Sequence, residues 1–233
     1  MLDYSLGIPE VDEITGGVPK GTNIMLLGPP LTGKHLLIRH IIYHTIKEGD
    51  SAVLVSTRDT GDEIIEWFSE YLEEEERSRI GIVDCVTKSL GKNIHDKDVV
   101  KYASSPVDLT GIGIKISQFF EEFIRRRQIP KTILCIDSVS TLLMYTNIQT
   151  LFRFLHVFTG RVKLAGAIGI YVVDEGMHDD KSINTLKQLF PAVFEVRTDG
   201  EENHLRILGL GSKPTPWKRY EIDGVEVVIK SGE

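Results

Sequence analysis

The residues with the clearest chemical potential form one short run near the N-terminus. Residues 28–35 fit the phosphate-binding pattern G-x-x-x-x-G-K-[ST] at every position except the last. In such a loop, backbone N–H groups and the start of the following helix point at phosphate oxygens, and the lysine neutralises charge further out. The candidate nucleotide-binding residues are therefore Gly28, Pro29, Pro30, Leu31, Thr32, Gly33, Lys34 and His35.

His35 stands where the pattern requires a serine or threonine. That hydroxyl normally ligates Mg²⁺, a hard cation that prefers oxygen, and an imidazole nitrogen is a poor substitute. The sequence thus predicts an intact phosphate cradle with a compromised magnesium site. It also predicts a hydrogen bond from His35 to the phosphates, with a charge when protonated, so that nucleotide affinity rises as the pH falls below ~6.5.

A second candidate residue, Asp137, follows the apolar run 132–136. Ligands of open α/β sheets bind outside the carboxyl ends of the strands, where this carboxylate would lie. Asp137 is therefore the candidate metal residue, which would hold the water shell of Mg²⁺. The alternative is a helix N-cap, because Asp137 and Ser138 precede another apolar stretch. The phosphate loop upstream favours the nucleotide site.

These residues need a frame of strands and helices, and the hydrophobic pattern supplies one. Continuously apolar segments predict strands, and apolar residues at helical spacing predict helices between them. The expected strands are 23–28, 52–57, 80–85, 132–136 and 167–173, the expected helices are 34–47, 62–76, 112–127 and 151–164, and alternating segments follow residue 192. This order predicts an α/β fold with a mostly parallel sheet, helices on both faces and antiparallel C-terminal strands, in a single domain of residues 1–233. The polar stretch 88–110 is a candidate loop.

Composition limits the possible function. The formal charge of −7 argues against a general polyanion binder, so nucleic acid is not an expected partner. Cys85 and Cys135 lie in apolar runs without metal-ligand spacing, and we expect buried reduced thiols. No apolar run reaches the ~18 residues of a membrane span and no signal segment begins the chain, so we expect a cytoplasmic protein without membrane contact.

With both motifs in place, the chain resembles the RecA-superfamily P-loop ATPases of the KaiC-like and RadA-paralog type. Residues 7–21 are similar to the family's G-x-x-x-h-D-x-h-x-G-G-h-x-x-G segment, and residues 137–142 to its D-S-h-[ST]-x-L segment. The likeness runs from about Leu6 to about Ile229, as one domain. It implies a RecA-like P-loop NTPase fold, ATP or ADP as ligand, and homo-oligomers such as rings.

Several positions depart from an active member of that family. After the second strand, Arg58 replaces one of two expected carboxylates, which leaves Asp59 as a weak candidate base whose basicity Arg58 should lower. Asp174 and Glu175 stand where a glutamine senses the γ-phosphate, and would repel it. Gly209 and Gly211 stand where a lysine and an arginine reach the neighbouring subunit's nucleotide. Slow or absent hydrolysis is predicted.

Three functions remain open on the sequence. The favoured one is a nucleotide-binding regulatory, accessory or assembly module that acts on a protein partner or on its own copies. The second is an active RadA-paralog-like ATPase of recombination or repair that uses Asp59. The third is a protein-interaction scaffold without nucleotide, like the ring-forming accessory ATPase of archaeal motility. The acidic segment 174–184, expected to be a surface loop, argues against DNA strand exchange.

Overall fold

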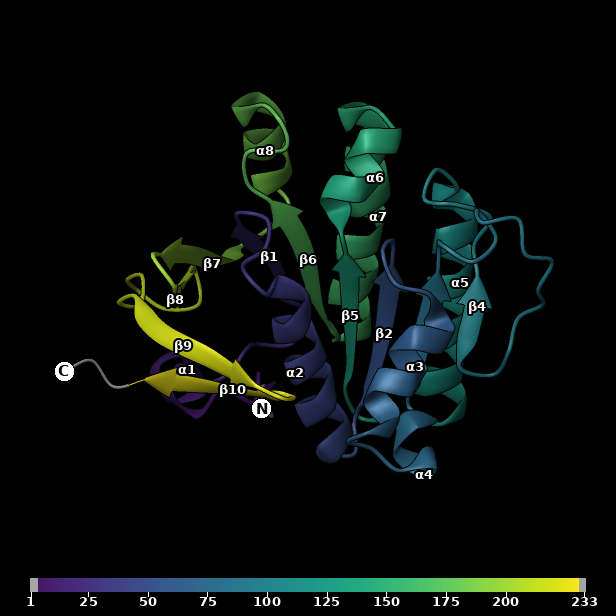
Figure 1. Cartoon of the computed structure of the whole chain (residues 1–233), viewed down its shortest axis with the longest axis horizontal. Coiled ribbons are helices and arrows are strands. Elements are labelled where there is room, and N and C mark those ends of the chain that lie inside the picture. The colour runs from purple at the N-terminus through teal and green to yellow at the C-terminus, as the bar shows by residue number, and fades with distance from the viewer. Residues whose placement is uncertain (1–3, 231–233) are drawn as a thin grey trace.

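The computed structural model describes residues 4–230, whose strands form one ten-stranded sheet in the order β10-β9-β8-β7-β1-β6-β5-β2-β3-β4 (Figure 1). From β4 to β7 in this order, neighbouring strands are parallel. From β7 to β10 they are antiparallel. The expected α/β fold with antiparallel C-terminal strands is confirmed.

The sheet strands are β1 (Asn23–Gly28), β2 (Ser51–Ser56), β3 (Ile80–Asp84), β4 (Val100–Tyr102), β5 (Thr132–Asp137), β6 (Ile168–Asp174), β7 (Ala192–Asp199), β8 (Glu202–Leu208), β9 (Lys218–Asp223) and β10 (Glu226–Lys230). The helices are α1 (Pro9–Thr15), α2 (Lys34–Lys47), α3 (Gly61–Ser69), α4 (Glu74–Arg77), α5 (Leu109–Phe120), α6 (Val139–Tyr145), α7 (Ile148–Ala165) and α8 (Asp180–Lys187), with a π-helical turn η1 (Glu121–Arg126) directly after α5. Among these described elements, no helix is long and apolar enough to cross a membrane.

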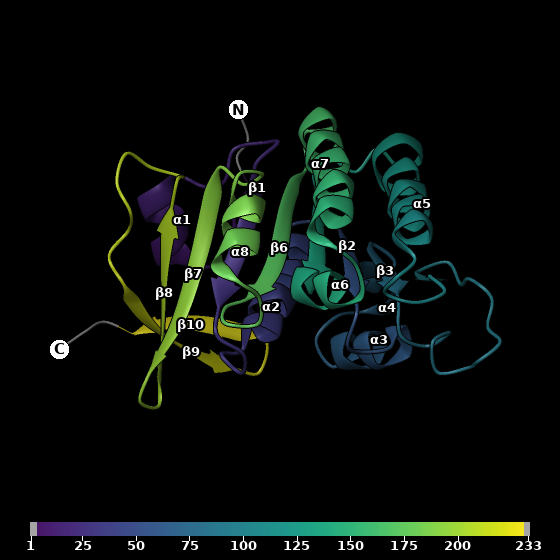
Figure 2. The same cartoon turned by 90° about the horizontal axis from the view of Figure 1, so that it is seen from above.

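Two apolar layers hold the sheet between the helices. One layer packs α1, α2 and α3 against one face, and the other packs α5, α6, α7 and α8 against the opposite face. Figure 2 shows the two helical layers on either side of the strands. Because both faces are covered, every residue of β1 and β2 is buried, which explains why these strands are apolar except at their ends, where Asn23, Ser51 and Ser56 lie.

Four expected segments differ in detail. The helix expected over 62–76 is divided into α3 and α4, and the acidic end forms its own turn with a reciprocal cap between Glu73 and Glu76. The helix expected over 112–127 is α5 followed by η1. The stretch 88–110 contains the edge strand β4.

The fourth difference concerns the segment 174–184, which is only partly a loop. α8 begins at Asp180, and the side chain of Asp179 accepts a hydrogen bond from Ser182 N–H at its start. Aspartate satisfies free N–H groups at a helix start, so one of the acidic residues has a local structural use. Both cysteines are free and buried, as expected.

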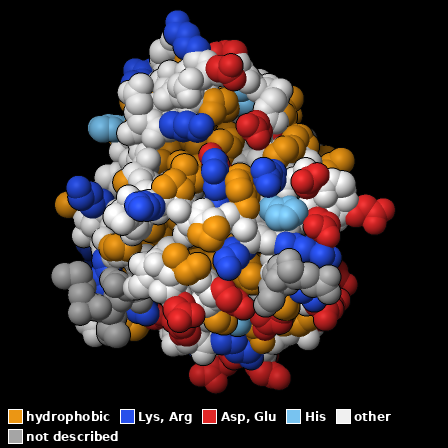
Figure 3. Space-filling model, turned by 90° about the vertical axis from the view of Figure 1, so that its left-hand side faces the viewer, with side chains coloured by type: hydrophobic (Ala, Val, Ile, Leu, Met, Phe, Trp, Pro, Cys, Tyr) orange, Lys and Arg blue, Asp and Glu red, His pale blue; other side chains and the backbone are white. Residues whose placement is uncertain are grey.

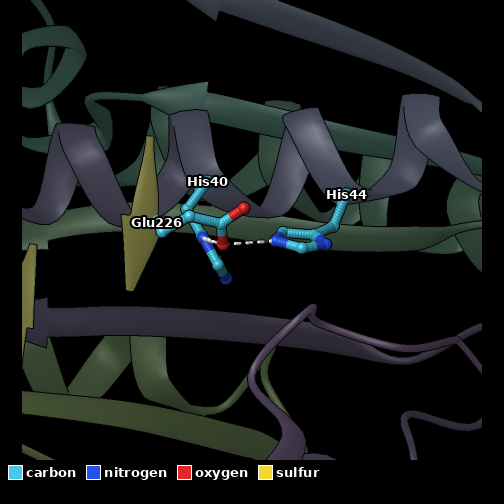
Figure 4. Close-up of side chains that lie close together, drawn as sticks. All are labelled: His40, His44 and Glu226. Carbon is cyan, nitrogen blue, oxygen red and sulfur yellow. Dashed lines mark hydrogen bonds and ion pairs between the residues drawn. The ribbon is translucent and has the colours of Figure 1, made fainter. Parts of the chain in front are cut away.

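The C-terminal hairpin β9–β10 fastens onto the helix that follows the phosphate loop. Tyr220 on β9 donates a hydrogen bond to the carbonyl of Thr32, at 3.0 Å. Further along α2, His44 Nε2 lies 2.8 Å from Glu226 Oε2 on β10, beside the fully buried His40 (Figure 4). We call His40, His44 and Glu226 the histidine clamp. On the side of the molecule formed by these C-terminal strands, acidic and basic side chains are interspersed (Figure 3).

Candidate functional site

The phosphate loop joins the end of β1 to the start of α2, as its mechanism requires. Gly33 occupies the N-cap position of α2 with φ +71°, a left-handed conformation that favours glycine. A Cβ on Gly28 would lie 2.4 Å from the carbonyl oxygen of Val196, so a larger residue does not fit there. Both glycines of the motif therefore have a geometric reason to be glycine.

Lys34 is buried and directed back onto its own loop. Its Nζ donates to the carbonyls of Gly28 and Pro29 at 2.9 and 2.5 Å, and forms an ion pair with Asp174 Oδ1 at 3.0 Å. The ammonium is thus fully engaged by protein oxygens in this structure. A phosphate that approached it would exchange with these partners.

A cavity of about 570 Å³ opens at the start of α2 and brings the ends of several strands together. Its lining is Pro30, Leu31, Thr32, Gly33, Lys34, His35, Leu36, Thr57, Arg58, Asp137, Ser138, Thr141, Val172, Asp174 and Met177. The loop residues Gly28 and Pro29 are not part of the lining, and their carbonyl oxygens accept hydrogen bonds from Lys34. The candidate base Asp59 is not part of the lining.

Asp137 lies at the end of β5 with its side chain directed into the cavity lining, and only 13% of that side chain is exposed. The N-cap of α6 is the next residue, since Ser138 Oγ accepts from Thr141 N–H at 3.1 Å. The local cap therefore leaves the aspartate carboxylate for the cavity. Burial raises the pKa of Asp137, and the nearby Arg58 opposes that rise.

Arg58 and Asp59 have different partners from those expected. Arg58 Nη2 lies 3.5 Å from Asp137 Oδ2, whereas Asp59 Oδ2 accepts from Arg39 Nη2 at 2.8 Å. The guanidinium of Arg39 also stacks over the ring of Trp67. In this structure the cation paired with Asp59 is therefore Arg39, whereas Arg58 faces Asp137.

His35 lines the cavity beside three cationic side chains. Its pKa is lowered from 6.5 by burial first, and then by the positive charges of Arg58 and Arg39. The imidazole is therefore neutral at neutral pH. The predicted rise of affinity on protonation must accordingly start at a lower pH than the ordinary histidine value.

Asp174 reaches the site from the strand beside the phosphate loop. Gly28 of β1 and Asp174 of β6 are paired in the parallel register, so the two strand ends lie side by side. Sequence reasoning had placed Asp174 and Glu175 together against a phosphate, but only Asp174 lines the cavity. The sequence did not indicate the ion pair between Asp174 and Lys34. That pair depends on β6 lying next to β1, which is a property of the strand order in the sheet.

Gly209 follows β8 and has a local role. Its φ is +86°, and a Cβ there would lie 2.1 Å from the carbonyl oxygen of Pro191. A basic side chain thus does not fit at this position. Of the basic residues nearby, Arg219 forms ion pairs with Glu202 and Glu221 on the C-terminal strands.

The histidine clamp is a second group of titratable residues. One ligand atom from each of its three residues lies within 4.8 Å of the others, a spacing that suits a metal ion. However, His40 Nε2 lies 3.0 Å from Gly7 O, and Nδ1 accepts from Val227 N–H at 3.0 Å. With its proton on Nε2, the ring satisfies both bonds and keeps no lone pair for a metal.

Comparison with known proteins places the chain in a family. Residues 21–196 match a family of unknown function, DUF7504. This chain belongs to that family. The matched segment of this DUF7504 member includes the phosphate loop, Arg58, Asp137 and Asp174.

Two curated relatives are archaeal. UPF0273 protein PH0284 of Pyrococcus horikoshii is 30% identical over 167 residues, which cover 69% of this chain and 62% of that protein. UPF0273 protein MK0039 of Methanopyrus kandleri is 31% identical over 114 residues, which cover 46% of this chain and 45% of that protein. The chain thus matches less than two thirds of the length of each of these relatives.

Two solved structures share the fold over almost the full length of both chains. The KaiC-like protein PH0186 of Pyrococcus horikoshii has a TM-score of 0.71 at 15% identity and covers 99% of each chain. The uncharacterized protein PH0321 of the same organism, solved in complex with an unknown peptide, has a TM-score of 0.74 at 16% identity and covers 98% of this chain and 99% of its own. The DUF7504 member has a KaiC-like fold of the RecA type.

Proposed function

We propose that this protein binds ATP or ADP through the loop 28–35 and functions by binding, with slow or absent hydrolysis. The observation that carries the proposal is the cavity at the start of α2, where Lys34, the strand-end carboxylate Asp137 and the helix N-terminus converge. Free N–H groups at a helix start favour an anionic ligand. The glycines at positions 28 and 33 permit the backbone path of the loop, because a Cβ on Gly28 would collide with Val196 and Gly33 has a positive φ.

Weak hydrolysis follows from the position of the candidate base. A general base must reach the water that it activates, directly or through one further water. Asp59 forms an ion pair with Arg39 and lies outside the cavity lining. Since a positioned base contributes a factor of about 10²–10⁴ in rate, its absence from the cavity predicts slow turnover.

A module of this kind would present a surface whose stability depends on nucleotide. Its partner would be another protein or further copies of this chain, and the function would be regulatory, accessory or in assembly. Nucleic acid is a less suitable partner because the chain carries a formal charge of −7. The site is poorly suited to Mg²⁺ bound together with the nucleotide, because His35 replaces the hydroxyl ligand.

Thermal unfolding tests the binding step. A ligand that binds only the native state raises its stability, by about 2.7 kcal/mol at 100 times Kd. We expect ATP and ADP to raise the Tm of the protein, and Lys34→Ala to abolish that rise. Lys213→Ala is the matched control, because Lys213 is an exposed lysine in the loop before β9. A Tm that neither nucleotide changes would contradict the proposal and favour the scaffold without nucleotide.

Single-turnover hydrolysis tests the second step. With protein in excess over radiolabelled ATP, phosphate release should stay close to that of the Lys34→Ala variant. Release well above that background, and lost on Asp59→Asn, would instead favour the active ATPase of the RadA-paralog type. The scaffold alternative has one structural observation in its favour, which is that protein oxygens already satisfy Lys34.

A further inference from the structure

We propose that the guanidinium of Arg58 takes the place of the magnesium ion at this site, so that the protein binds its nucleotide without a divalent metal. This inference rests on the proposed nucleotide binding and concerns how that site neutralises the phosphates. The observation behind it is the contact between Arg58 Nη2 and Asp137 Oδ2, at 3.5 Å. Asp137 is the carboxylate that would otherwise hold the hydrated metal.

The backbone around Arg58 is fixed against β5. Thr57 N–H donates to Asp137 O at 2.9 Å, and Thr57 Oγ1 donates to the same carbonyl at 3.1 Å. Ser138 N–H in turn donates to Thr57 Oγ1 at 2.9 Å. Residue 58 therefore emerges at a defined point on the cavity wall, while 56% of its side chain stays exposed and free to turn toward a ligand.

The oxygen ligands needed for magnesium are incomplete here. Mg²⁺ requires near-octahedral oxygen coordination, and position 35 offers an imidazole in place of a hydroxyl. The remaining carboxylate, Asp137, already faces a cation. A divalent ion beside Asp137 would also be repelled by the Arg58 guanidinium, because both charges would lie within a few ångströms. The residues present thus do not fit Mg²⁺.

Charge balance in the cavity favours the exchange. The lining contains two cationic side chains, Lys34 and Arg58, and two anionic ones, Asp137 and Asp174. Each cation is paired with one carboxylate before a ligand enters. A metal-free di- or triphosphate offers both cations stronger anionic partners. The planar fork of arginine matches two phosphate oxygens at once, which a lysine at the same place does not.

Calorimetric titration with ATP and with ADP, each in EDTA and in excess Mg²⁺, tests the proposal on the full chain. For the wild type we expect Kd values in the two buffers within about 2-fold of each other. Arg58→Ala should weaken binding in EDTA by about 10-fold or more, the effect of a lost charge-assisted contact. The affinity of Arg58→Lys in EDTA should lie between those of the wild type and Arg58→Ala. The control Arg125→Ala, on a side chain that is 78% exposed on η1, should bind as the wild type does.

A double variant provides the converse test. His35→Ser with Arg58→Ala restores the hydroxyl ligand and releases Asp137, so Mg²⁺ should now tighten binding by about 10-fold or more. Thermal unfolding without nucleotide verifies that each variant is folded. Because Arg58 is largely exposed and His35 is only partly buried at the cavity, we expect every one of these variants to keep its fold.

Three outcomes would overturn the inference. The first is wild-type binding that depends on Lys34 but tightens at least 10-fold with Mg²⁺, and the second is Arg58→Ala binding that equals the wild type in EDTA. The third is a double variant that Mg²⁺ leaves unchanged. In these cases nucleotide binding itself would stand. If no nucleotide bound in either buffer, the proposed function would fail together with the inference.

Discussion

Two groups of polar side chains on the same helix have opposite surroundings. At the start of α2, Lys34 and His35 line a cavity, and the partners of Lys34 include the carboxylate of Asp174 from a neighbouring strand. Within two turns, His40 is completely buried, and its ring nitrogens are held by the backbone of Gly7 and Val227. Lys34 and His35 thus face a cavity with room for a ligand. His40 instead connects the N-terminal segment to the C-terminal hairpin.

The difference shows that burial alone does not mark a functional group. Both Lys34 and His40 are buried and hydrogen-bonded, so both meet the usual requirement for polar groups in a protein interior. A ligand can replace the partners of Lys34 because they border a cavity. Nothing can replace the partners of His40 without unfolding the N-terminal segment or the C-terminal hairpin. Substitutions in each group should therefore affect different measurements.

The largest effect is expected from His40→Ala. It removes a buried ring and leaves the carbonyl of Gly7 and the N–H of Val227 without partners. The free energy of unfolding should fall by about 3 kcal/mol, as is usual when a core site loses both packing and hydrogen bonds. Urea unfolding measures this loss. His95→Ala, on an exposed side chain, is the control, and an equal loss in both variants would contradict the comparison.

The next largest effect should come from Asp174→Asn at the other end of the helix. Neutralising this carboxylate removes the anion that competes with phosphate for Lys34, 3.0 Å away. Nucleotide affinity should rise by about 10-fold, with little change in stability. Titration with ADP provides the measurement. Glu175→Gln removes an exposed charge one residue away and should leave Kd unchanged. Weaker binding by Asp174→Asn would show that Asp174 supports the ligand.

Acidification should destabilise the fold through the histidines of α2. Burial lowers the pKa of His40 and of His35 below 6.5. Below about pH 6.5 these histidines bind protons in the unfolded chain more readily than in the folded chain. The free energy of unfolding is therefore highest above about pH 6.5 and falls as the pH decreases toward the folded pKa values. The charges facing His40 are those of His44 and Glu226.

Urea unfolding between pH 5 and 8 measures this dependence. The wild type should lose stability as the pH falls from 6.5, and His40→Ala should lose less over the same range. His35→Ala reports the contribution from the cavity end. A free energy of unfolding that increases on acidification from pH 6.5 to 5.5 would contradict the predicted direction of the pH dependence.

The smallest effect is expected at the partly exposed edge of the histidine clamp. Glu226→Gln breaks the ion pair between Glu226 and His44, whose side chains are 45% and 29% exposed, respectively. Exposed ion pairs contribute about 0–1 kcal/mol to the free energy of unfolding. Zn²⁺ should leave the Tm unchanged, because His40 has no nitrogen available for it. A rise in Tm with Zn²⁺ that Glu226→Gln removes would identify a metal site instead.

Much of the frame was predictable because burial on both faces leaves a clear pattern. The apolar runs at 23–28 and 132–136 match β1 and β5 closely, and the glycines and lysine of the loop have fixed geometric uses. β4 was missed because Val100–Tyr102 is a short edge strand in a polar stretch. The break between α3 and α4 was missed because helical spacing continues across it.

The sequence by itself determined the strand–loop–helix phosphate motif, the carboxylate at the end of β5 and the absence of a hydroxyl at position 35. These are local features, since spacing and residue type act within a few residues. Only the tertiary structure decided that Lys34 pairs with Asp174, Arg58 with Asp137, and Asp59 with Arg39. Those pairs depend on which strands are neighbours and which way each side chain leaves its strand, and sheet order is a long-range property of the fold.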